Sequence, residues 1–349
     1  MNESIILKNF SKINLKDTFF DSLRNDYGCI EFNQWFNKKI FQKESAYILE
    51  NSEGIQGFLY LKEENENDKK IYPEFPMGKK LKIGTFKINS HGTKLGERFI
   101  KIILDQMILR KLSFSYLTIY KKYSFLTELL VTYGFKHWGK KGNEDVYIKN
   151  LTFQNRHPQK DFPIMNMNYK KYILSIYPKY HTKLFPDSKL MTEKDHIIED
   201  WSPTNCIEKI YLSGKKECLR LKEGDLITIY RTAEEGKKAE YNSVISSICS
   251  VITVKDISSF KNMSEFLDFC KKRTIFTEIE LKSFWNTKKY PYLIIFQYNL
   301  ALPKRIIRKK LIEEIKIPRN LRLTFLEITD EQFNKILELG EVPKIYFRG

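Results

Sequence analysis

Residues 82–104 read KIGTFKINSHGTKLGERFIKIIL and contain the strongest local signal in this chain of 349 residues. LKIGTFKI (81–88) is typical of a β-strand, and ERFIKIILDQMILRK (97–111) has apolar residues at helical spacing. The turn between them contains Gly92 and Gly96. A helix that begins directly after such a turn leaves its first amides unpaired, and these amides attract phosphate. A turn that needs glycine only for its own geometry is the alternative interpretation.

The surrounding pattern indicates an α/β domain over residues 1–150. Apolar residues recur at helical spacing in LKDTFFDSLRND (15–26) and FNQWFNKKIFQ (32–42). Two strands, 44–51 and 55–64, are joined by a turn of hairpin length. After the opening stretch come a strand at 116–122, a helix at 125–135 and a strand at 143–151. Alternating helices and strands predict helices packed on a central mixed sheet.

With this order of elements, residues 1–150 resemble the GNAT superfamily of acyltransferases. Its pyrophosphate loop follows the pattern Q/R-x-x-G-x-G/A after the fourth strand. Here His91 stands at the Q/R position, Lys94 at the middle glycine and Gly96 at the last, so His91 and Lys94 depart from the pattern. The superfamily's loop contacts are largely through backbone amides, so a lysine at the middle position is compatible if its backbone adopts the turn. Gly134 and Phe135 match the superfamily's penultimate helix, which ends in Gly-Phe before a last strand.

The resemblance implies acetyl-CoA as cofactor and a site around the glycine turn. The strand residues before the turn are the expected backbone partners of the pantetheine arm and the thioester. The turn and the first helical residues are the expected phosphate site, to which Lys94 and Arg98 add positive charge. The implied cofactor-binding residues are Phe86, Lys87, Ile88, His91, Gly92, Thr93, Lys94, Leu95, Gly96, Glu97 and Arg98.

The proton donor for the leaving thiolate has no direct match in this sequence. In the superfamily a tyrosine often stands four residues before the glycine at the helix end, and here that position is Leu130. Tyr123 is the first candidate to replace it, ahead of Tyr120 and Tyr133. For each of these tyrosines, packing in the core is the alternative role and the more common one. The sequence identifies no base: Glu97 or a water relay are the options, and Glu97 is more typical of a first-turn residue that complements the helix dipole.

The pattern changes after residue 150. Prolines recur through aromatic-rich sequence, which predicts an ordered connector over 151–204. Three strand-like segments then begin with KEGDLITIYRT, YNSVISSICSV and YPYLIIFQYNL, and the pairs Thr277 with Glu280 and Thr329 with Gln332 fit helix capping boxes. These observations predict a small α+β domain over 205–349.

Residues 205–335 resemble the ASCH/EVE group of PUA-like domains, a β-barrel fold associated with RNA or modified-base binding. The resemblance rests on element order and a few phrases such as LKEGDLITIYRT. It implies RNA contacts by Arg231, at the end of a barrel strand, and by Lys304, Arg305 and Arg308, which cluster with Lys309 and Lys310 at the start of a helix. The run PKRIIRKKLIEEIKI also fits an ordinary amphipathic helix with solvated charges.

The composition of the chain bears on nucleic-acid binding, metal sites and membrane insertion. Lys and Arg number 60 against 43 Asp and Glu, and the net charge of +17 favours contact with a polyanion such as RNA. The five cysteines lie at least 12 positions apart and the five histidines are dispersed, so no metal site is expected. The longest apolar runs fall far short of a membrane span, and the first residues lack the order of a signal peptide, so a cytoplasmic location is expected.

Together, a GNAT-like domain with a PUA-like partner resembles known bacterial architectures. We expect an N-acetyltransferase that modifies an amine on RNA, an aminoacyl group on tRNA being the first guess. Two alternatives stay open: a non-catalytic RNA-binding regulator whose loop signature has been lost, and an acetyltransferase for proteins or small molecules.

Overall fold

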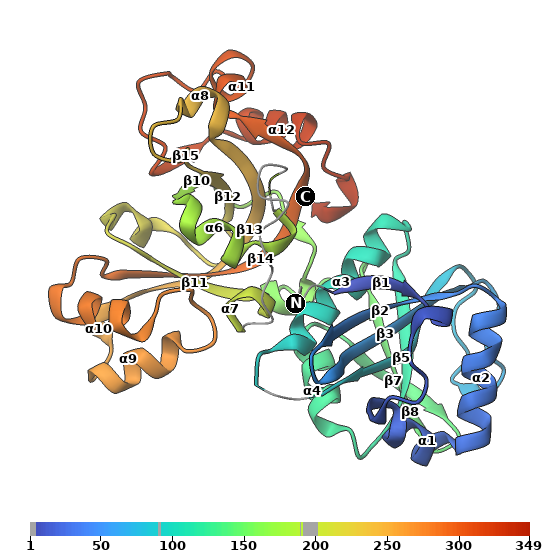
Figure 1. Cartoon of the computed structure of the whole chain (residues 1–349). Helices are drawn as coiled ribbons and strands as arrows, with labels where there is room; N and C mark the ends of the chain where they lie inside the picture. The colour runs from blue at the N-terminus through green and yellow to red at the C-terminus, as the bar shows by residue number, and fades with distance from the viewer. Residues whose placement is uncertain (1–4, 90–91, 189, 191–201) are drawn as a thin grey trace. The chain divides into compact units, whose positions relative to one another are not determined.

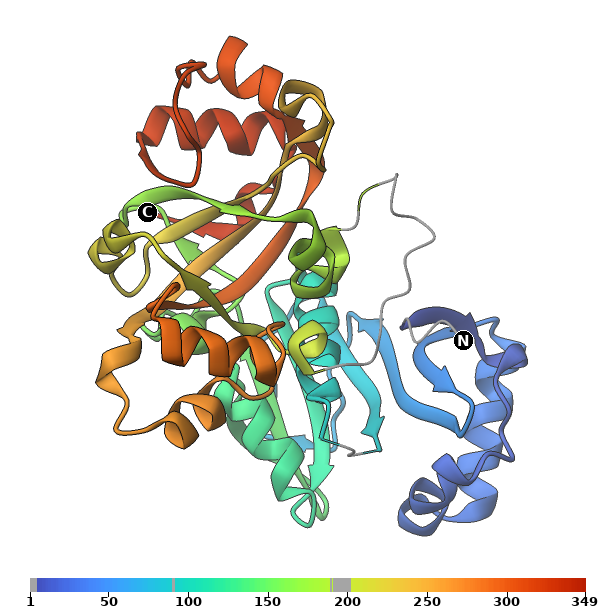
Figure 2. The same ribbon diagram turned by 60° about the vertical axis from the view of Figure 1, so that its left-hand side comes forward.

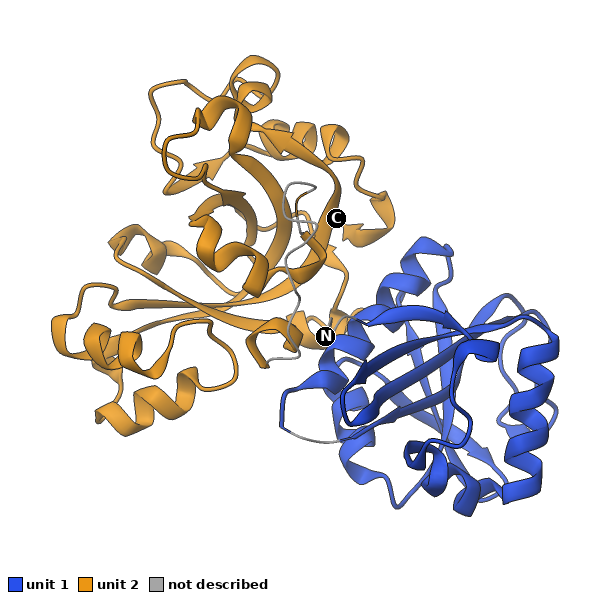
Figure 3. Ribbon diagram, viewed as in Figure 1, with its two compact units in different colours: residues 1–153, 197–201 blue, residues 154–196, 202–349 orange. Residues whose placement is uncertain are grey.

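The computed structural model describes residues 5–89, 92–188, 190 and 202–349 (Figure 1). The chain divides into two compact units (Figure 3): unit 1 comprises residues 1–153 with 197–201, and unit 2 comprises residues 154–196 with 202–349. Within the described residues, no helix has the length and apolar character needed to cross a bilayer.

Unit 1 is built on an eight-stranded mixed sheet in the order β1-β2-β3-β5-β6-β8-β7-β4. Its strands are β1 (Ile6–Asn9), β2 (Ser45–Asn51), β3 (Gly54–Glu64), β4 (Ile71–Tyr72), β5 (Lys80–Ile88), β6 (Phe114–Tyr120), β7 (Lys136–Lys141) and β8 (Glu144–Asn150). All neighbouring pairs are antiparallel except β5 and β6.

The parallel pair β5 and β6 is joined over a short length only. Leu81 pairs with Ser115 and Lys82 with Tyr116. From there β5 continues to Ile88 and β6 to Tyr120 without further pairing between them. The two strands therefore separate in the middle of the sheet, and one edge of β5 is left without a strand partner.

Helices cover both faces of this sheet (Figure 2). α1 (Asp21–Tyr27) and α2 (Cys29–Phe41) pack on one face, where Phe20, Phe32 and Phe36 join Phe58 and Tyr60 of β3 in an aromatic core. α3 (Leu95–Leu109) and α4 (Ser124–Thr132) lie on the other face. Gly57 of β3 points there, since a Cβ at this position would lie 2.4 Å from the Phe99 ring of α3. Successive β3 residues thus serve opposite faces, as the period of a strand requires.

Unit 2 contains a six-stranded mixed sheet in the order β11-β14-β13-β12-β10-β15 and a two-stranded ribbon of β9 and β16. The strands are β9 (Met165–Asn166), β10 (Lys171–Ile176), β11 (Glu208–Ser213), β12 (Leu226–Arg231), β13 (Val244–Asp256), β14 (Tyr292–Ile307), β15 (Phe325–Ile328) and β16 (Phe347–Arg348). β10 and β12 are parallel, and the other pairs of the larger sheet are antiparallel.

Short helices surround the sheet of unit 2. They are α5 (Pro158–Asp161), α6 (Pro178–Leu184), α7 (Ser202–Asn205), α8 (Ala239–Asn242), α9 (Met263–Cys270), α10 (Glu278–Thr287), α11 (Arg308–Glu313) and α12 (Asp330–Leu339). The expected capping boxes of α10 and α12 are confirmed, because Thr277 and Glu280, and Thr329 and Gln332, exchange both hydrogen bonds.

Three features of unit 2 differ from the sequence-based expectation. The larger sheet ends at β11 on one side and at β15 on the other, so its pairing does not close a barrel among the described residues. Residues 171–176, inside the expected connector, form β10 in the interior of that sheet. Lys304 and Arg305 do not begin a helix, because their strand continues to Ile307, which pairs with Val244 of β13.

Candidate functional site

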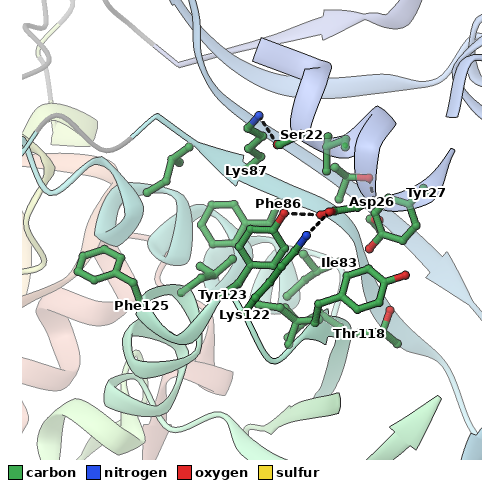
Figure 4. A pocket seen from close by; sticks show the side chains of 18 of the residues that line it. Ser22, Asp26, Tyr27, Ile83, Phe86, Lys87, Thr118, Lys122, Tyr123 and Phe125 are labelled. Atoms are coloured by element: carbon green, nitrogen blue, oxygen red, sulfur yellow. Dashed lines mark hydrogen bonds and ion pairs between the residues drawn. The ribbon is translucent and has the colours of Figure 1, made fainter. Parts of the chain in front are cut away.

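The separation of β5 and β6 creates a cavity of about 300 Å³ in unit 1 (Figure 4). We call it the slot. Residues 83–88 of β5 and 117–120 of β6 form its sides, and α1 and the first turns of α4 complete its wall. Most of the lining side chains are apolar, among them Ile83, Phe86 and Leu117. The slot can therefore hold an extended, mostly apolar chain beside the unpaired edge of β5.

Gly84 forms a bulge in β5 at the slot. In the ladder between β3 and β5, Tyr60 pairs with Thr85 and Leu61 with Ile83, so Gly84 is passed over. A Cβ at Gly84 would lie 2.7 Å from the Tyr60 ring, which explains the glycine. On its β6 side the bulge has no strand partner, so a backbone amide of the bulge is a candidate donor to an oxyanion.

The turn before α3 has the backbone geometry that a glycine-rich phosphate loop needs. Gly92 has φ +82°, and Lys94 has φ 58° and ψ 24°, so a lysine does occupy the left-handed region at the middle position. The Lys94 ammonium lies 2.5 Å from the Glu97 carboxylate. Thr93 and Lys94 are half-buried, whereas residues Leu95, Gly96, Glu97 and Arg98 are buried in the first turn of α3. His91 lies outside the described residues.

Gly96 is required for close packing of α3 and does not face open space. A Cβ on Gly96 would lie 2.6 Å from Leu129 Cδ2 of α4 and 3.1 Å from Ile88 Cδ1 of β5. Both of these residues line the slot. The glycine therefore lets α3 lie close to the slot wall.

The other expected cofactor-binding residues of β5 all line the slot. Phe86 also packs on Phe99 of α3, with ring centroids 5.8 Å apart. The Lys87 ammonium donates to Ser22 Oγ at 2.6 Å and to the Phe19 carbonyl (Figure 4). Burial lowers the pKa of Lys87. This lysine therefore ties β5 to α1 across one end of the slot.

Tyr123, the first candidate acid, lines the slot directly before α4 (Figure 4). Its hydroxyl donates to Asp26 of α1, whose carboxylate also accepts from the Lys122 ammonium. The Asp26 side chain is only 4% exposed. Burial and the Asp26 hydrogen bond raise the pKa of Tyr123, so its hydroxyl keeps its proton over the range in which an enzyme operates. A protonated hydroxyl at the slot can serve as a general acid.

The two other tyrosine candidates are placed differently. Tyr120 lines the slot at the end of β6, with its ring centroid 5.6 Å from that of Tyr27. Tyr133 is buried outside the slot lining and donates to Glu97 Oε2 at 2.9 Å. Tyr133 and Glu97 thus form a buried pair beneath the start of α3.

A second cavity of about 440 Å³ adjoins the slot. We call it the side cavity. Leu23, Tyr27, Gly84, Thr85 and Thr118 line both spaces, so the two meet where β5 and β6 separate. The remaining lining of the side cavity combines aromatic, lysine and glutamate side chains: Glu31, Phe32, Trp35, Lys39, Tyr60, Lys62, Glu64, Lys82, Lys141 and Glu144.

Two of the arginines expected to bind RNA make contacts within unit 2. Arg231 closes β12, is 2% exposed and donates to Glu234 Oε1 at 2.8 Å. Arg305 donates to the carbonyls of Leu302 and Asp187, the latter at 3.1 Å.

The other two basic positions, Lys304 and Arg308, also have partners in unit 2. Lys304 is exposed and lies 2.9 Å from Glu341 Oε1. Arg308 donates to the carbonyls of Arg319 and Leu321 at 3.0 and 3.2 Å. The structure therefore brings Lys304, Arg305 and Arg308 together around the end of β14, each with a partner in the protein.

Sequence analysis missed Asp26, Tyr27 and Glu144. Asp26 is 97 positions from Tyr123, and Tyr27 is 117 positions from Glu144, to which it donates at 2.9 Å. No motif spacing links such pairs. The only local signal is the polar end of a helical pattern before Gly28, which is equally typical of a solvated helix end.

Comparisons with known proteins complete the description. No family model matches the chain. No curated protein matches it either. Solved structures similar to part of it include ASCH from Zymomonas mobilis, at 11% identity and TM-score 0.32 over 49% of this chain and 95% of that one. A GNAT-family acetyltransferase from Listeria monocytogenes matches at 15% identity and TM-score 0.27 over 42% and 94%. The Campylobacter jejuni N-acetyltransferase PseH, solved with acetyl coenzyme A, matches at 16% identity and TM-score 0.30 over 42% and 99%.

Proposed function

We propose that unit 1 is an acetyl-CoA-dependent N-acetyltransferase that acts on an amine carried by RNA, with aminoacyl-tRNA as the first candidate. The observation that carries this proposal is the separation of β5 and β6 around the slot. The pantetheine arm contains amide groups that can pair with the free edge of β5, and its apolar carbons suit the lining. An amide at the Gly84 bulge would stabilise the oxyanion formed when an amine attacks the thioester.

The turn at residues 92–94 supports a phosphate site at the other end of the cofactor. Its left-handed residues lead directly into the N-terminus of α3, a helix of 15 residues. The dipole of α3 and the left-handed turn before it favour a pyrophosphate there. Tyr123 would return a proton to the CoA thiolate.

Calorimetric titration with acetyl-CoA tests the cofactor site, using Thr93→Glu and Thr93→Gln as a matched pair. Both side chains have similar size, but only glutamate places a negative charge where the pyrophosphate would bind. We expect Thr93→Glu to weaken binding by about tenfold or more and Thr93→Gln to change it by about threefold or less. A negative charge beside the start of α3 also suits the helix dipole, so the fold should persist. Gly96 is a poor test position because its Cβ would strike Leu129.

The acceptor is tested by acetyl transfer to charged tRNA. The net charge of +17 and the basic positions around the end of β14 motivate RNA docking on unit 2. We expect transfer to the aminoacyl group and RNA binding that weakens as salt rises. Turnover on proteins or polyamines without RNA binding would instead favour the protein or small-molecule acetyltransferase. RNA binding without acetyl-CoA binding would favour the non-catalytic regulator.

A further inference from the structure

The junction of the slot and the side cavity determines how an acceptor could reach the cofactor. Tyr27, Gly84, Thr85 and Thr118 line both spaces. A thioester held at the Gly84 bulge would therefore face the side cavity. An amine arriving through the side cavity must lose a proton at this junction, so a proton acceptor is needed within hydrogen-bond reach.

Three glutamates line the side cavity, and their surroundings differ. Glu64 lies 2.5 Å from the Tyr116 hydroxyl and 3.1 and 3.5 Å from the ammonium groups of Lys62 and Lys82. Burial alone would raise the pKa of Glu64, but the Tyr116 hydroxyl and the two lysines hold it below its ordinary value. Glu64 is therefore a weak base. Glu31 is exposed in the first turn of α2.

Glu144 differs from both because it is linked to the junction. It begins β8, and its Oε1 accepts a hydrogen bond from the Tyr27 hydroxyl at 2.9 Å. Glu144 lines only the side cavity, whereas Tyr27 lines both spaces. Tyr27 is 44% exposed, so its burial is partial; this burial and the Glu144 carboxylate raise the pKa of Tyr27, which keeps the hydroxyl protonated.

We propose that Tyr27 and Glu144 form the proton relay of the acetyl transfer, Tyr27 as the catalytic residue at the amine and Glu144 as the positioning residue that receives the proton. This inference rests on the proposed function. It supplies the base that sequence analysis could not identify, and it places Glu97, buried against Tyr133 and Lys94, outside the proton path.

The step balances with the groups present. The amine nitrogen forms a bond to the thioester carbon, and the carbon–sulfur bond breaks to release the CoA thiolate. Before the attack, one proton of the ammonium passes to the Tyr27 oxygen while the Tyr27 proton passes to Glu144. After the attack, the second proton of the nitrogen leaves to solvent. The thiolate takes a proton from Tyr123, and solvent later returns the proton of Glu144 to Tyr123.

The chemistry of the side cavity guides the choice of probe. The partly buried ring of Trp35 can stack on a base, and the lysines can pair with phosphate. Puromycin, an aminoacyl-nucleoside with a free α-amine, is therefore the small probe, and aminoacyl-tRNA is the large one.

The test measures acetyl transfer to both probes between about pH 6 and 8.5 for the wild type, Glu144→Gln and Tyr27→Phe. We expect the wild-type kcat/KM to stay nearly level up to the pKa of the amine. In both variants the reaction must use amine that is already neutral, so kcat/KM should rise about tenfold per pH unit over the acidic part of the range. At the lowest pH the variants should be slower by roughly a hundredfold. A purely structural role would lower the rate equally at every pH.

The control is Glu53→Gln, an exposed glutamate in the turn between β2 and β3 that lines neither cavity. It should behave as the wild type, and Glu144→Gln should bind acetyl-CoA with unchanged affinity. Variants that keep the wild-type pH profile would overturn the relay while the proposed function stands. A wild type that binds acetyl-CoA but acetylates neither probe would overturn the relay and the RNA-linked acceptor and leave the cofactor site standing. No binding of acetyl-CoA would remove both proposals.

Discussion

At the scale of single residues, the slot is defined by contacts between segments far apart in the chain. Asp26 accepts hydrogen bonds from both Lys122 and Tyr123 and joins α1 to the start of α4. A nearly buried carboxylate is stable only when donors surround it, so these two contacts support each other. The result is a tyrosine fixed in orientation at the wall of the slot.

Replacement of this tyrosine tests its role as the acid. We expect Tyr123→Phe to lower kcat for acetyl transfer by roughly a hundredfold and to leave the KM for acetyl-CoA nearly unchanged, because the ring still lines the slot. Tyr133→Phe is the comparison. It removes the buried hydrogen bond to Glu97, so stability should fall by about 1 kcal/mol without a change in kcat. Equal losses of kcat in both variants would contradict the assignment.

Individual residues also mark the limit of what the sequence could predict. Tyr123 was a candidate because it follows a strand and precedes a helix, which is a local signal. Asp26 and Glu144 could not be candidates, since an isolated carboxylate has no spacing that separates a buried partner from a solvated one. The bulge at Gly84 could not be predicted either. It depends on Tyr60, which lies opposite it on β3, and no local sequence pattern shows this contact.

At the scale of helices and strands, hydrophobic periodicity is sufficient to predict most of the long elements of unit 1. The hairpin of β2 and β3, the strand β5, the helix α3 and both capping boxes follow from patterns that are complete within the segment. The sequence did not indicate the short strands β1 and β4 or the six-residue strand β7. The segment at 304–307 was assigned to a helix because its apolar spacing fits one, but pairing with β13 overrides this local preference.

The end of α3 offers a test at this scale. Lys111 has φ 56°, and its amide donates to the Ile108 carbonyl, while that of Leu112 donates to the Met107 carbonyl. This is the Schellman arrangement with lysine where glycine is usual. We expect Lys111→Gly to raise the free energy of unfolding by up to about 1 kcal/mol, because glycine adopts this conformation without strain.

Lys111→Ala is the matched control for that measurement. It removes the same long side chain but keeps the Cβ that causes the strain, so urea denaturation should show no comparable gain. Lys111 is exposed, so loss of its side chain should cost little in either variant. A gain of the same size in both variants would show that strain at Lys111 is not the cause.

At the scale of the whole molecule, ionisable groups are unevenly buried. The net charge of +17 is mostly on the surface, yet the side chains of His181 and Lys209 are fully buried in unit 2. Lys209 is surrounded by the carbonyls of Pro203, Thr204 and Cys206, which satisfy its charge. His181 lies 2.7 Å from Ser246 Oγ and has no carboxylate partner in the described residues.

The burial of His181 predicts a loss of stability in acid. Burial, followed by the charges of Arg231 and Arg305, lowers the pKa of His181 to about 3. In the unfolded chain the histidine pKa is near 6.5, so between pH 6.5 and 3 the unfolded chain binds one more proton than the folded protein. The contribution of neutral His181 to the free energy of unfolding is therefore complete above about pH 6.5 and is lost as the pH falls. Between about pH 7 and 4.5 the loss should reach roughly 3 kcal/mol for this group alone.

Hydrogen exchange in peptides that cover β13 measures this contribution within unit 2, because β13 contains Ser246, the partner of His181. In the wild type, protection of these amides should fall steeply from about pH 7 to 4.5 after correction for the intrinsic exchange rate. His181→Asn can keep a hydrogen bond to Ser246 but cannot titrate. The variant should start from lower protection at neutral pH and lose less of it in acid. Parallel pH profiles for the two proteins would assign the acid sensitivity to carboxylates and would show that His181 is not its cause.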